Sequence, residues 1–398
     1  MDIHVVRAGE TVSSVAARYG VPAGILAGVN GVAPDAPLAV GQTLVVRHPR
    51  ELHTVASGES VYSIALRYGL SVRTLYQNNP ALGGRSALYP GQTLVIAYDD
   101  APLRTLAVNA YSYPFIRGGL LDAVLPYLTY LTPFTYGINA DGTLLPLADE
   151  WLLAAAGQYR TAALMHLSTL TEEGRFDNAR STLILEDADA QDALVQSILE
   201  TVQARHYFGL DVDFEYVLPE QREAYAAFIT RLREALNPLG CPVIVALAPK
   251  TSAVQRGLLY EAHDYALLGA AANAVFLMTY EWGYTAGPPM AVSPLPNVRT
   301  VLDYAVTEIP PEKIFLGLSN YGYDWPLPFV QGVTRAPSIS NQRAIELAIE
   351  HDVAIQYDET AQAPFFHYTA ADGTIHEVWF EDARSIAAKL SLIPEYGL

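Results

Sequence analysis

The chain has 398 residues, of which 51% are hydrophobic and 17% charged, with 24 basic against 42 acidic side chains. One hydrophobic core rarely serves that length, so we expect two or three domains. The net charge of −18 disfavours binding to nucleic-acid phosphates or to an anionic membrane, because such contacts need clustered Lys and Arg. The lone cysteine, Cys241, excludes an intramolecular disulfide, and no two histidines lie at metal-ligand spacing. We therefore expect neither a metal nor a cofactor.

The N-terminus has neither the basic nor the apolar segment of a secretory signal. No stretch reaches the roughly 18 uninterrupted apolar residues that a membrane-spanning helix needs. We expect a protein that is made without a signal peptide, has no membrane partner and is monomeric.

The first hundred residues contain one clear internal repeat. Gly9-Glu10-Thr11-Val12 recurs as Gly58-Glu59-Ser60-Val61, and Gly41-Gln42-Thr43-Leu44-Val45 recurs as Gly91-Gln92-Thr93-Leu94-Val95. Matches that persist through a whole unit indicate two tandem modules of one structure. A capping residue, an apolar face at helical spacing and a closing apolar run predict the order strand, helix, helix, strand in each. Residues 1–98 hold 5 acidic and 7 basic residues, which leaves 37 acidic and 17 basic for the remainder.

The two units, residues 1–48 and 49–98, resemble LysM domains, which bind glycans that contain N-acetylglucosamine. The resemblance implies a peptidoglycan or chitin-like partner, held by the loop before the first helix and the loop after the second. Those loops supply Gly9, Glu10, Thr11 and Asn30 in the first module and Gly58, Glu59, Ser60 and Asn79 in the second. The alternative is that these residues only cap helices and turn the chain, because caps and turns use the same residue types.

Residues 103–398 follow a boundary at Asp99-Asp100-Ala101-Pro102. Here apolar strand-like runs alternate with helical patterns, which predicts an α/β fold, a (β/α)8 TIM barrel. The predicted strands cover residues 105–110, 127–135, 161–167, 207–215, 242–248, 274–280, 314–320 and 375–380. The predicted helices cover 189–205, 219–236, 254–269, 297–308 and 381–390. The long interval between the seventh and eighth strands predicts a small α+β insertion, with a helix over 340–351 and hairpin-like segments over 354–358 and 365–369.

Three carboxylates alternate along the fourth predicted strand. Because successive side chains on a strand point to opposite faces, Asp211, Asp213 and Glu215 share one face. A barrel interior is normally filled by branched apolar side chains, so acids there indicate a catalytic role. Like charges this close raise at least one pKa, and Glu215 lies nearest the carboxyl-terminal mouth, which makes it the general-acid candidate. A structural ion-pair network is the alternative, but the strand supplies no basic residue.

The segment from Phe208 to Glu215 resembles the D-G-x-D-x-D-x-E signature of the family 18 glycoside hydrolases, the chitinase-type barrels. Phe208 stands where the first Asp is usual, so the resemblance implies that an inner member of the carboxylate relay is missing. Met278-Thr279-Tyr280-Glu281 resembles the family's M-x-Y-D motif, and Tyr321-Gly322 resembles its seventh-strand motif. Trp379 stands where the family places the tryptophan under the scissile sugar.

This resemblance implies substrate-assisted retaining hydrolysis, in which the sugar's own acetamido group is the nucleophile. Glu215 would protonate the glycosidic oxygen and later activate water, Asp213 would orient the acetamido group, and Asp211 would hold the protonation state of Asp213. Tyr280 would hydrogen-bond the acetamido carbonyl oxygen. Further predicted substrate contacts are Trp379, Glu281, Trp282, Tyr321, Trp325 and Asn109. For Trp282 and Trp325, packing in the core is an equally good interpretation.

The whole chain, with two LysM-like modules and the run from Met278 to Met290, is similar to the spore-cortex lytic N-acetylglucosaminidases of spore-forming bacteria. The resemblance implies hydrolysis of β-1,4 bonds after N-acetylglucosamine in peptidoglycan, and deposition in the spore coat or cortex region. Two alternatives stay open: a chitinase, and a wall-binding or coat protein with an inactive barrel. The sequence does not decide between internal and terminal cleavage.

Overall fold

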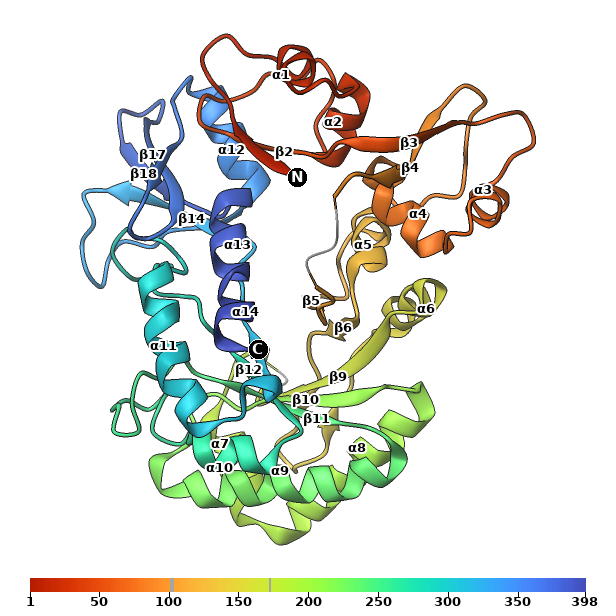
Figure 1. The fold of residues 1–398 in the computed structure, drawn as a ribbon. Coiled ribbons are helices and arrows are strands. Elements are labelled where there is room, and N and C mark those ends of the chain that lie inside the picture. Colours follow the sequence, from red (N-terminus) through yellow and green to blue (C-terminus); the bar gives the residue numbers. More distant parts are fainter. Residues whose placement is uncertain (101–103, 172) are drawn as a thin grey trace.

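The computed structural model describes residues 1–100, 104–171 and 173–398, arranged as two small modules above a larger domain (Figure 1). Ala101 and Pro102 of the predicted boundary, and the next residue of the chain, lie outside the described residues. No single helix in the described ranges has the length and apolar character to cross a membrane. The helices α1 (Val12–Tyr19) and α2 (Ala23–Val29) pass such a test only as a pair, bent by 108°.

Both modules have the predicted order of elements. The first consists of β1 (Asp2–Val5), α1 (Val12–Tyr19), α2 (Ala23–Val29) and β2 (Thr43–Val46). The second consists of β3 (Pro49–Thr54), α3 (Val61–Arg67), α4 (Val72–Asn78) and β4 (Thr93–Tyr98). The two strands of each module pair antiparallel. Thr11 and Ser60 cap α1 and α3 through capping boxes, as the repeat predicted.

The larger domain is built on a curled parallel sheet. In the described residues this sheet has seven strands, in the order β13-β12-β11-β10-β9-β6-β5. They are β5 (Asn109–Ser112), β6 (Tyr130–Pro133), β9 (Ala162–Ser168), β10 (Gly209–Asp213), β11 (Val243–Leu247), β12 (Ala274–Leu277) and β13 (Ile314–Leu316). A short hairpin, β7 (Gly137–Ile138) with β8 (Leu144–Leu145), follows β6. Parallel neighbours in chain order with helical crossovers are the pattern of the predicted barrel.

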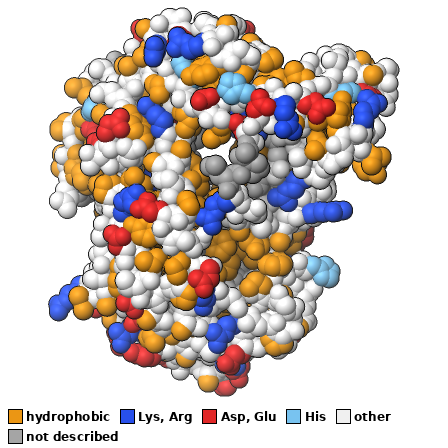
Figure 2. All heavy atoms as spheres, viewed as in Figure 1, with side chains coloured by type: hydrophobic (Ala, Val, Ile, Leu, Met, Phe, Trp, Pro, Cys, Tyr) orange, Lys and Arg blue, Asp and Glu red, His pale blue; other side chains and the backbone are white. Residues whose placement is uncertain are grey.

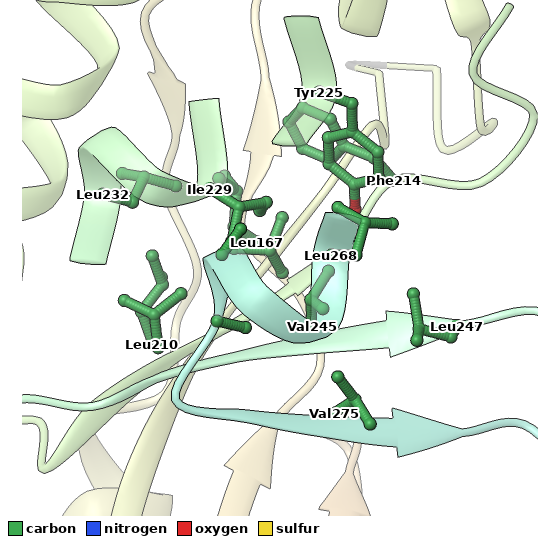
Figure 3. Packing of buried hydrophobic residues seen from close by; sticks show 14 of the residues in the cluster. Leu167, Leu210, Phe214, Tyr225, Ile229, Leu232, Val245, Leu247, Leu268 and Val275 are labelled. Carbon is green, nitrogen blue, oxygen red and sulfur yellow. The ribbon is translucent and has the colours of Figure 1, made fainter. Parts of the chain in front are cut away.

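Helices cover the outer face of this sheet. They are α5 (Gly118–Val124), α6 (Glu150–Tyr159), α7 (Asn178–Glu186), α8 (Ala188–Arg205), α9 (Arg222–Leu236), α10 (Tyr265–Ala271) and α11 (Leu295–Glu308). Figure 3 shows the main core, where Leu210 and Phe214 meet Tyr225 and Ile229 of α9. The predicted helix over 254–269 is wrong in its first part: the chain turns until Asp264, whose side chain caps α10. The apolar residues of these turns, Val254 and Leu258, are exposed, so their helical spacing did not reflect a buried helix face.

The eighth predicted strand forms, but in a different sheet. β18 (Ile375–Trp379) pairs antiparallel with its neighbours, so the prediction that residues 375–380 add an eighth parallel strand is wrong for the described residues. Alternation along a segment indicates a half-buried strand and carries no information about which sheet it joins. The chain leaving β18 does return to the parallel sheet, because Ser319, beyond β13, donates to Glu381 at 3.1 Å.

β18 belongs to a five-stranded antiparallel sheet between β13 and the last helices, with the order β15-β14-β18-β17-β16. Its other elements are β14 (Tyr321–Leu327), β15 (Ser338–Ser340), α12 (Asn341–Glu350), β16 (Gln356–Asp358) and β17 (Ala363–Thr369). α13 (Ala383–Leu390) and α14 (Leu392–Tyr396) end the chain. One apolar cluster of this region includes Trp379 and borders Tyr280, whereas the other includes α12 residues and Ala39 of the first module.

Candidate active site

The predicted carboxylates lie together at the carboxyl end of β10. Asp211 and Asp213 are buried, and Glu215 follows the strand where it is partly exposed. The alternate residues, Leu210 and Phe214, point into the core (Figure 3), where the Phe214 ring stacks on Tyr225 at 5.8 Å between centroids. The strand therefore holds its acids on the inner face by burying its apolar side chains on the outer one.

Few groups neutralise these acids. The Tyr111 hydroxyl donates to Asp211 Oδ2 at 2.6 Å, and His166 Nε2 lies 3.7 Å from Asp213 Oδ2. Burial lowers the pKa of His166 to about 3, so its ring is neutral and provides no counter-charge. Asp211 Oδ1 and Asp213 Oδ1 are buried, with no hydrogen-bond partner among the described residues. A buried carboxylate oxygen without a hydrogen-bond donor favours the protonated form of the acid, or is free to accept a hydrogen bond from a substrate.

Burial and mutual repulsion raise the pKa of all three acids. Burial raises the pKa of Asp211 to about 7, against an opposing effect of the Tyr111 hydrogen bond. Burial, then Glu215 and then Asp211, raises the pKa of Asp213 well above its ordinary value. For Glu215 the pKa is raised by burial and then by the charge of Glu281. Near neutral pH this group of acids therefore retains protons that it can transfer.

Tyr280 and Glu281 follow β12 and form the opposite side of the site. Tyr280 lines the same cavity as Asp211 and Asp213, which has a volume of about 680 Å³. Glu281 has a left-handed backbone with φ of 67°, which is unusual for a residue other than glycine. Its carboxylate accepts hydrogen bonds from the hydroxyls of Tyr321 and Tyr323, the second at 2.9 and 3.1 Å to its two oxygens. These two tyrosines thus hold the exposed Glu281 carboxylate in place.

The three predicted tryptophans differ in placement. Trp379 is 8% exposed, stacks on Phe365 at 4.7 Å between centroids, and lies in the cluster that borders Tyr280. Trp325 is fully buried, and its indole N–H donates to the Gly287 carbonyl oxygen at 2.8 Å. Trp282 is half-buried against the main core. Trp325 therefore offers no face to a glycan in this structure, whereas Trp379 lies beside the site.

Two further sequence expectations concern the amino-terminal end of the sheet. Asn109 lines the far part of the cavity at the start of β5, and its Oδ1 accepts from Thr132 at 2.9 Å. Phe208 precedes β10, and its ring lies 5.6 Å from that of Tyr130. Phe208 is thus separated from Glu215 by the whole strand, and the three acids are arranged without it.

Sequence reasoning missed Tyr111, His166 and Tyr323. Tyr111 could have been predicted from the sequence, because it lies two residues after Asn109 on β5 and alternation places both on one face of the strand. His166 is on β9 opposite Asp211, a pairing that only the sheet register reveals. Tyr323 reaches Glu281 from the antiparallel sheet, and no spacing in the sequence indicates that contact.

His263 was also missed, and it connects the ends of two strands. Its Nδ1 accepts from the Ala248 N–H at 2.8 Å, so Nε2 carries the proton and donates to the Phe214 carbonyl oxygen at 3.0 Å. The residue is fully buried, and burial lowers its pKa to about 4, which keeps this neutral tautomer. His263 therefore fixes the backbone one residue before Glu215 and ties it to the strand end of β11.

The predicted glycan contacts of the modules are engaged inside the modules. Glu10 accepts from His4 Nε2 at 2.7 Å and pairs with Arg18 at 2.6 Å. The second module repeats this with Glu59, His53 and Arg67. Asn30 and Asn79 bond backbone groups of the neighbouring helix and strand, Thr11 and Ser60 cap helices, and Gly9 and Gly58 turn with φ of 79° and 84°. These side chains match the capping and turning interpretation, and their contact with glycan stays a prediction.

No group of three or more His, Cys, Asp or Glu side chains in the described ranges is arranged to hold a metal ion. Tyr111 donates a hydrogen bond to Asp211, and Tyr280 lines the cavity that these acids share.

Comparison with known proteins agrees with this geometry. The model of the glycosyl hydrolases family 18 matches residues 171–398, and the LysM domain model matches residues 4–47 and 53–97. The cortical fragment-lytic enzyme of Bacillus subtilis (strain 168) is 41% identical over 100% of this chain and 93% of the relative. The crystal structure of the Bacillus cereus spore cortex-lytic enzyme SleL superposes with a TM-score of 0.83 at 38% identity, covering 100% of this chain and 92% of that one.

A chitinase from Chromobacterium violaceum is similar over 74% of this chain and 92% of its own, with a TM-score of 0.68 at 27% identity. The family model covers more than half of the chain, and the Bacillus relatives match it from end to end. The chain therefore belongs to glycosyl hydrolase family 18, in the group of glycosidases that carry two LysM domains before the catalytic domain.

Proposed function

We propose that the protein hydrolyses the β-1,4 glycosidic bond that follows N-acetylglucosamine in peptidoglycan. The observation that carries the proposal is the group of buried acids on β10, in which Asp211 and Asp213 each keep an unpartnered oxygen and Glu215 lies at the open end. Such a group is costly to the fold and is retained where it performs proton transfer.

The mechanism follows from where the protons are held. Glu215, kept protonated by burial and by Glu281, donates its proton to the glycosidic oxygen. The acetamido oxygen of the same sugar attacks the anomeric carbon, and the leaving sugar departs with the proton. Asp213, as the carboxylate, accepts a hydrogen bond from the acetamido N–H and stabilises the positive ring. A negative charge on Asp211 would oppose the ionisation of Asp213, and burial, which raises the pKa of Asp211 to about 7, lets Asp211 keep its proton. Glu215 then deprotonates the water that opens this ring, which retains the configuration.

Tyr280 and Trp379 supply the remaining contacts of this proposal. The Tyr280 hydroxyl, beside both aspartates in the cavity, donates to the acetamido oxygen and aligns it for attack. Trp379, held by the Phe365 stack and by a 2.7 Å hydrogen bond from its indole N–H to Glu377, offers an apolar surface under the sugar. Alignment of this kind replaces a bimolecular encounter by an intramolecular one.

The substrate is spore cortex peptidoglycan or its fragments. The full-length similarity to proteins named cortical fragment-lytic and spore cortex-lytic enzymes supports this choice, as do the two LysM domains. We place the domain boundaries at 1–48, 49–98 and 103–398, and the protein in the coat or cortex region of the spore as a monomer. A chitinase is the second candidate, favoured by the similarity to the Chromobacterium violaceum chitinase.

Mass spectrometry of digested cortex tests the proposal, with Glu215→Gln as the matched variant. We expect products with N-acetylglucosamine at the new reducing end from the wild type, and none from the variant. Products that end in reducing muramic acid would refute the mechanism, because that sugar is not the one placed over Asp213. Faster turnover of chitin oligomers than of cortex fragments would instead favour the chitinase.

A further inference from the structure

The two modules share one internal design, so their surfaces can be compared position by position. In each module a glutamine side chain closes the turn before the last strand. Gln42 Oε1 accepts from the Ala39 N–H at 3.1 Å, and Gln92 Oε1 accepts from the Tyr89 N–H at 3.2 Å. Ala39 and Tyr89 therefore occupy equivalent places on two copies of the same turn.

In the first module this turn is covered by the catalytic domain. Ala39 is 4% exposed and belongs to an apolar cluster with residues of α12 and β17. The Val40 carbonyl oxygen accepts from the Ile355 N–H at 2.8 Å. At Gly41 a Cβ atom would lie 1.9 Å from the Ile355 carbonyl oxygen, so only glycine permits this approach. The catalytic domain therefore covers Ala39, the position equivalent to Tyr89.

In the second module the same turn is open. Tyr89 is 72% exposed. This module contacts the catalytic domain through a different side, α4, where Arg73 and Gln77 donate to the Pro126 carbonyl oxygen at 2.7 and 2.8 Å. The first module lacks these donors on its own α2, where Gly28 takes the place of Gln77. A Cβ atom at Gly28 would lie 3.1 Å from the Ala81 Cβ atom of the second module. The two modules, although alike in structure, thus contact the catalytic domain through different sides. Only the contact made by the second module leaves its turn residue, Tyr89, exposed.

The first helix of each module shows a matching difference in residue type. The N-caps Thr11 and Ser60 align α1 with α3, which makes Ser13 equivalent to Tyr62 and the exposed Ala17 equivalent to Leu66. Tyr62 and Leu66 are each 68% exposed and lie one turn apart on α3. Figure 2 shows hydrophobic side chains at the outer edge of the second module, beside α3. At these two helix positions the second module exposes large apolar groups where the first has small residues.

We propose that the second module alone provides the glycan-binding surface, formed by Tyr62, Leu66 and Tyr89, while the first module anchors the pair to the catalytic domain. This inference rests on the proposed function, since it takes the substrate of the catalytic domain as the ligand. Its occupant is a β-1,4-linked strand of N-acetylated sugars: aromatic rings accept the apolar C–H faces of pyranoses, and phenol groups bond their polar substituents. The modules, with 5 acidic and 7 basic residues, do not share the acidity of the remainder and so do not repel an anionic wall polymer.

Sedimentation with insoluble spore peptidoglycan tests this division, using the full chain with Glu215→Gln so that the polymer is not digested. We expect Tyr62→Ala combined with Tyr89→Ala to weaken binding by about ten-fold or more, since a few aromatic contacts dominate such interfaces. The matched control is Ser13→Ala, at the position equivalent to Tyr62 in the first module, and it should leave binding unchanged. Both changes affect exposed side chains, and equal melting temperatures will verify that the fold is intact.

Unchanged binding of the double tyrosine variant would overturn the proposal, and so would a comparable loss on Ser13→Ala. A third refuting outcome is concentration-dependent dimerisation of the wild type that the tyrosine changes abolish, because the face would then bind a second copy of the chain. The proposed function fails separately, through the products of digestion: a protein that binds peptidoglycan through the second module yet releases the wrong reducing end would retain this inference and lose the mechanism.

Discussion

Asp211→Asn should make the folded protein more stable at alkaline pH while it impairs catalysis. Burial raises the pKa of Asp211 from 3.8 to about 7. A carboxyl with a higher pKa in the folded state stabilises the fold fully below its unfolded pKa, and this stabilisation is lost as the pH rises through the folded pKa. At about 1.4 kcal/mol per pKa unit, the loss between roughly pH 4 and pH 7 is about 4 kcal/mol. Asparagine carries no charge, so the free energy of unfolding of the variant does not fall in this pH range. Its side-chain oxygen can still accept the hydrogen bond from Tyr111.

Urea unfolding of wild type and variant at pH 5 and pH 8 measures the effect. The free energy of unfolding of the wild type should fall relative to that of the variant by about 3 kcal/mol between these conditions, because most of the titration lies between them. Asp35→Asn, at an exposed loop position of the first module, removes the same charge from the surface and serves as the control. A difference between wild type and Asp211→Asn that is equal at both pH values would refute the reasoning, since a steric effect does not titrate.

Three further predictions concern residues that contact the active site or stabilise the catalytic domain around it. Glu281→Gln removes the charge that helps raise the pKa of Glu215, so the basic limb of the pH–activity profile should move to lower pH. His263→Leu should lower kcat by about ten-fold or more with little change in KM, and His263→Gln should recover part of it, as measured by steady-state kinetics. Lys389→Met breaks the fully buried 2.7 Å pair with Glu381 and should cost about 3–5 kcal/mol in urea unfolding. A second change, Glu381→Leu, should restore much of that loss, because no buried charge is then left unpaired.

The sequence alone located the acids because alternation is a local property. Asp211, Asp213 and Glu215 share a face for the same reason that Leu210 and Phe214 share the other, and no tertiary contact is needed to see it. The repeat likewise predicted both modules with their caps, since Thr11 and Ser60 act within one helical turn.

The features that the sequence did not predict depend on contacts between segments far apart in the chain. β18 has the pattern of any half-buried strand, and its assignment to the antiparallel sheet rests on pairing with Tyr323 and Phe365. The burial of Trp325 and the contact of Tyr323 with Glu281 arise from that same sheet. His263 lies in a turn without regular structure, and its two hydrogen bonds join strand ends that no spacing brings together.

The contacts of Val40 with Ile355 and of Arg73 with Pro126 have a consequence for how long substrates are handled. A binding module on a flexible linker raises the local concentration of its substrate by an amount that depends on linker length. Here each module is hydrogen-bonded to the catalytic domain, so the span from module to active site is set by packing and not by a tether. The fixed span therefore selects substrates by length: only a glycan strand long enough and suitably curved to reach both the module and the active site gains from simultaneous binding. Shorter fragments depend on the cleft alone.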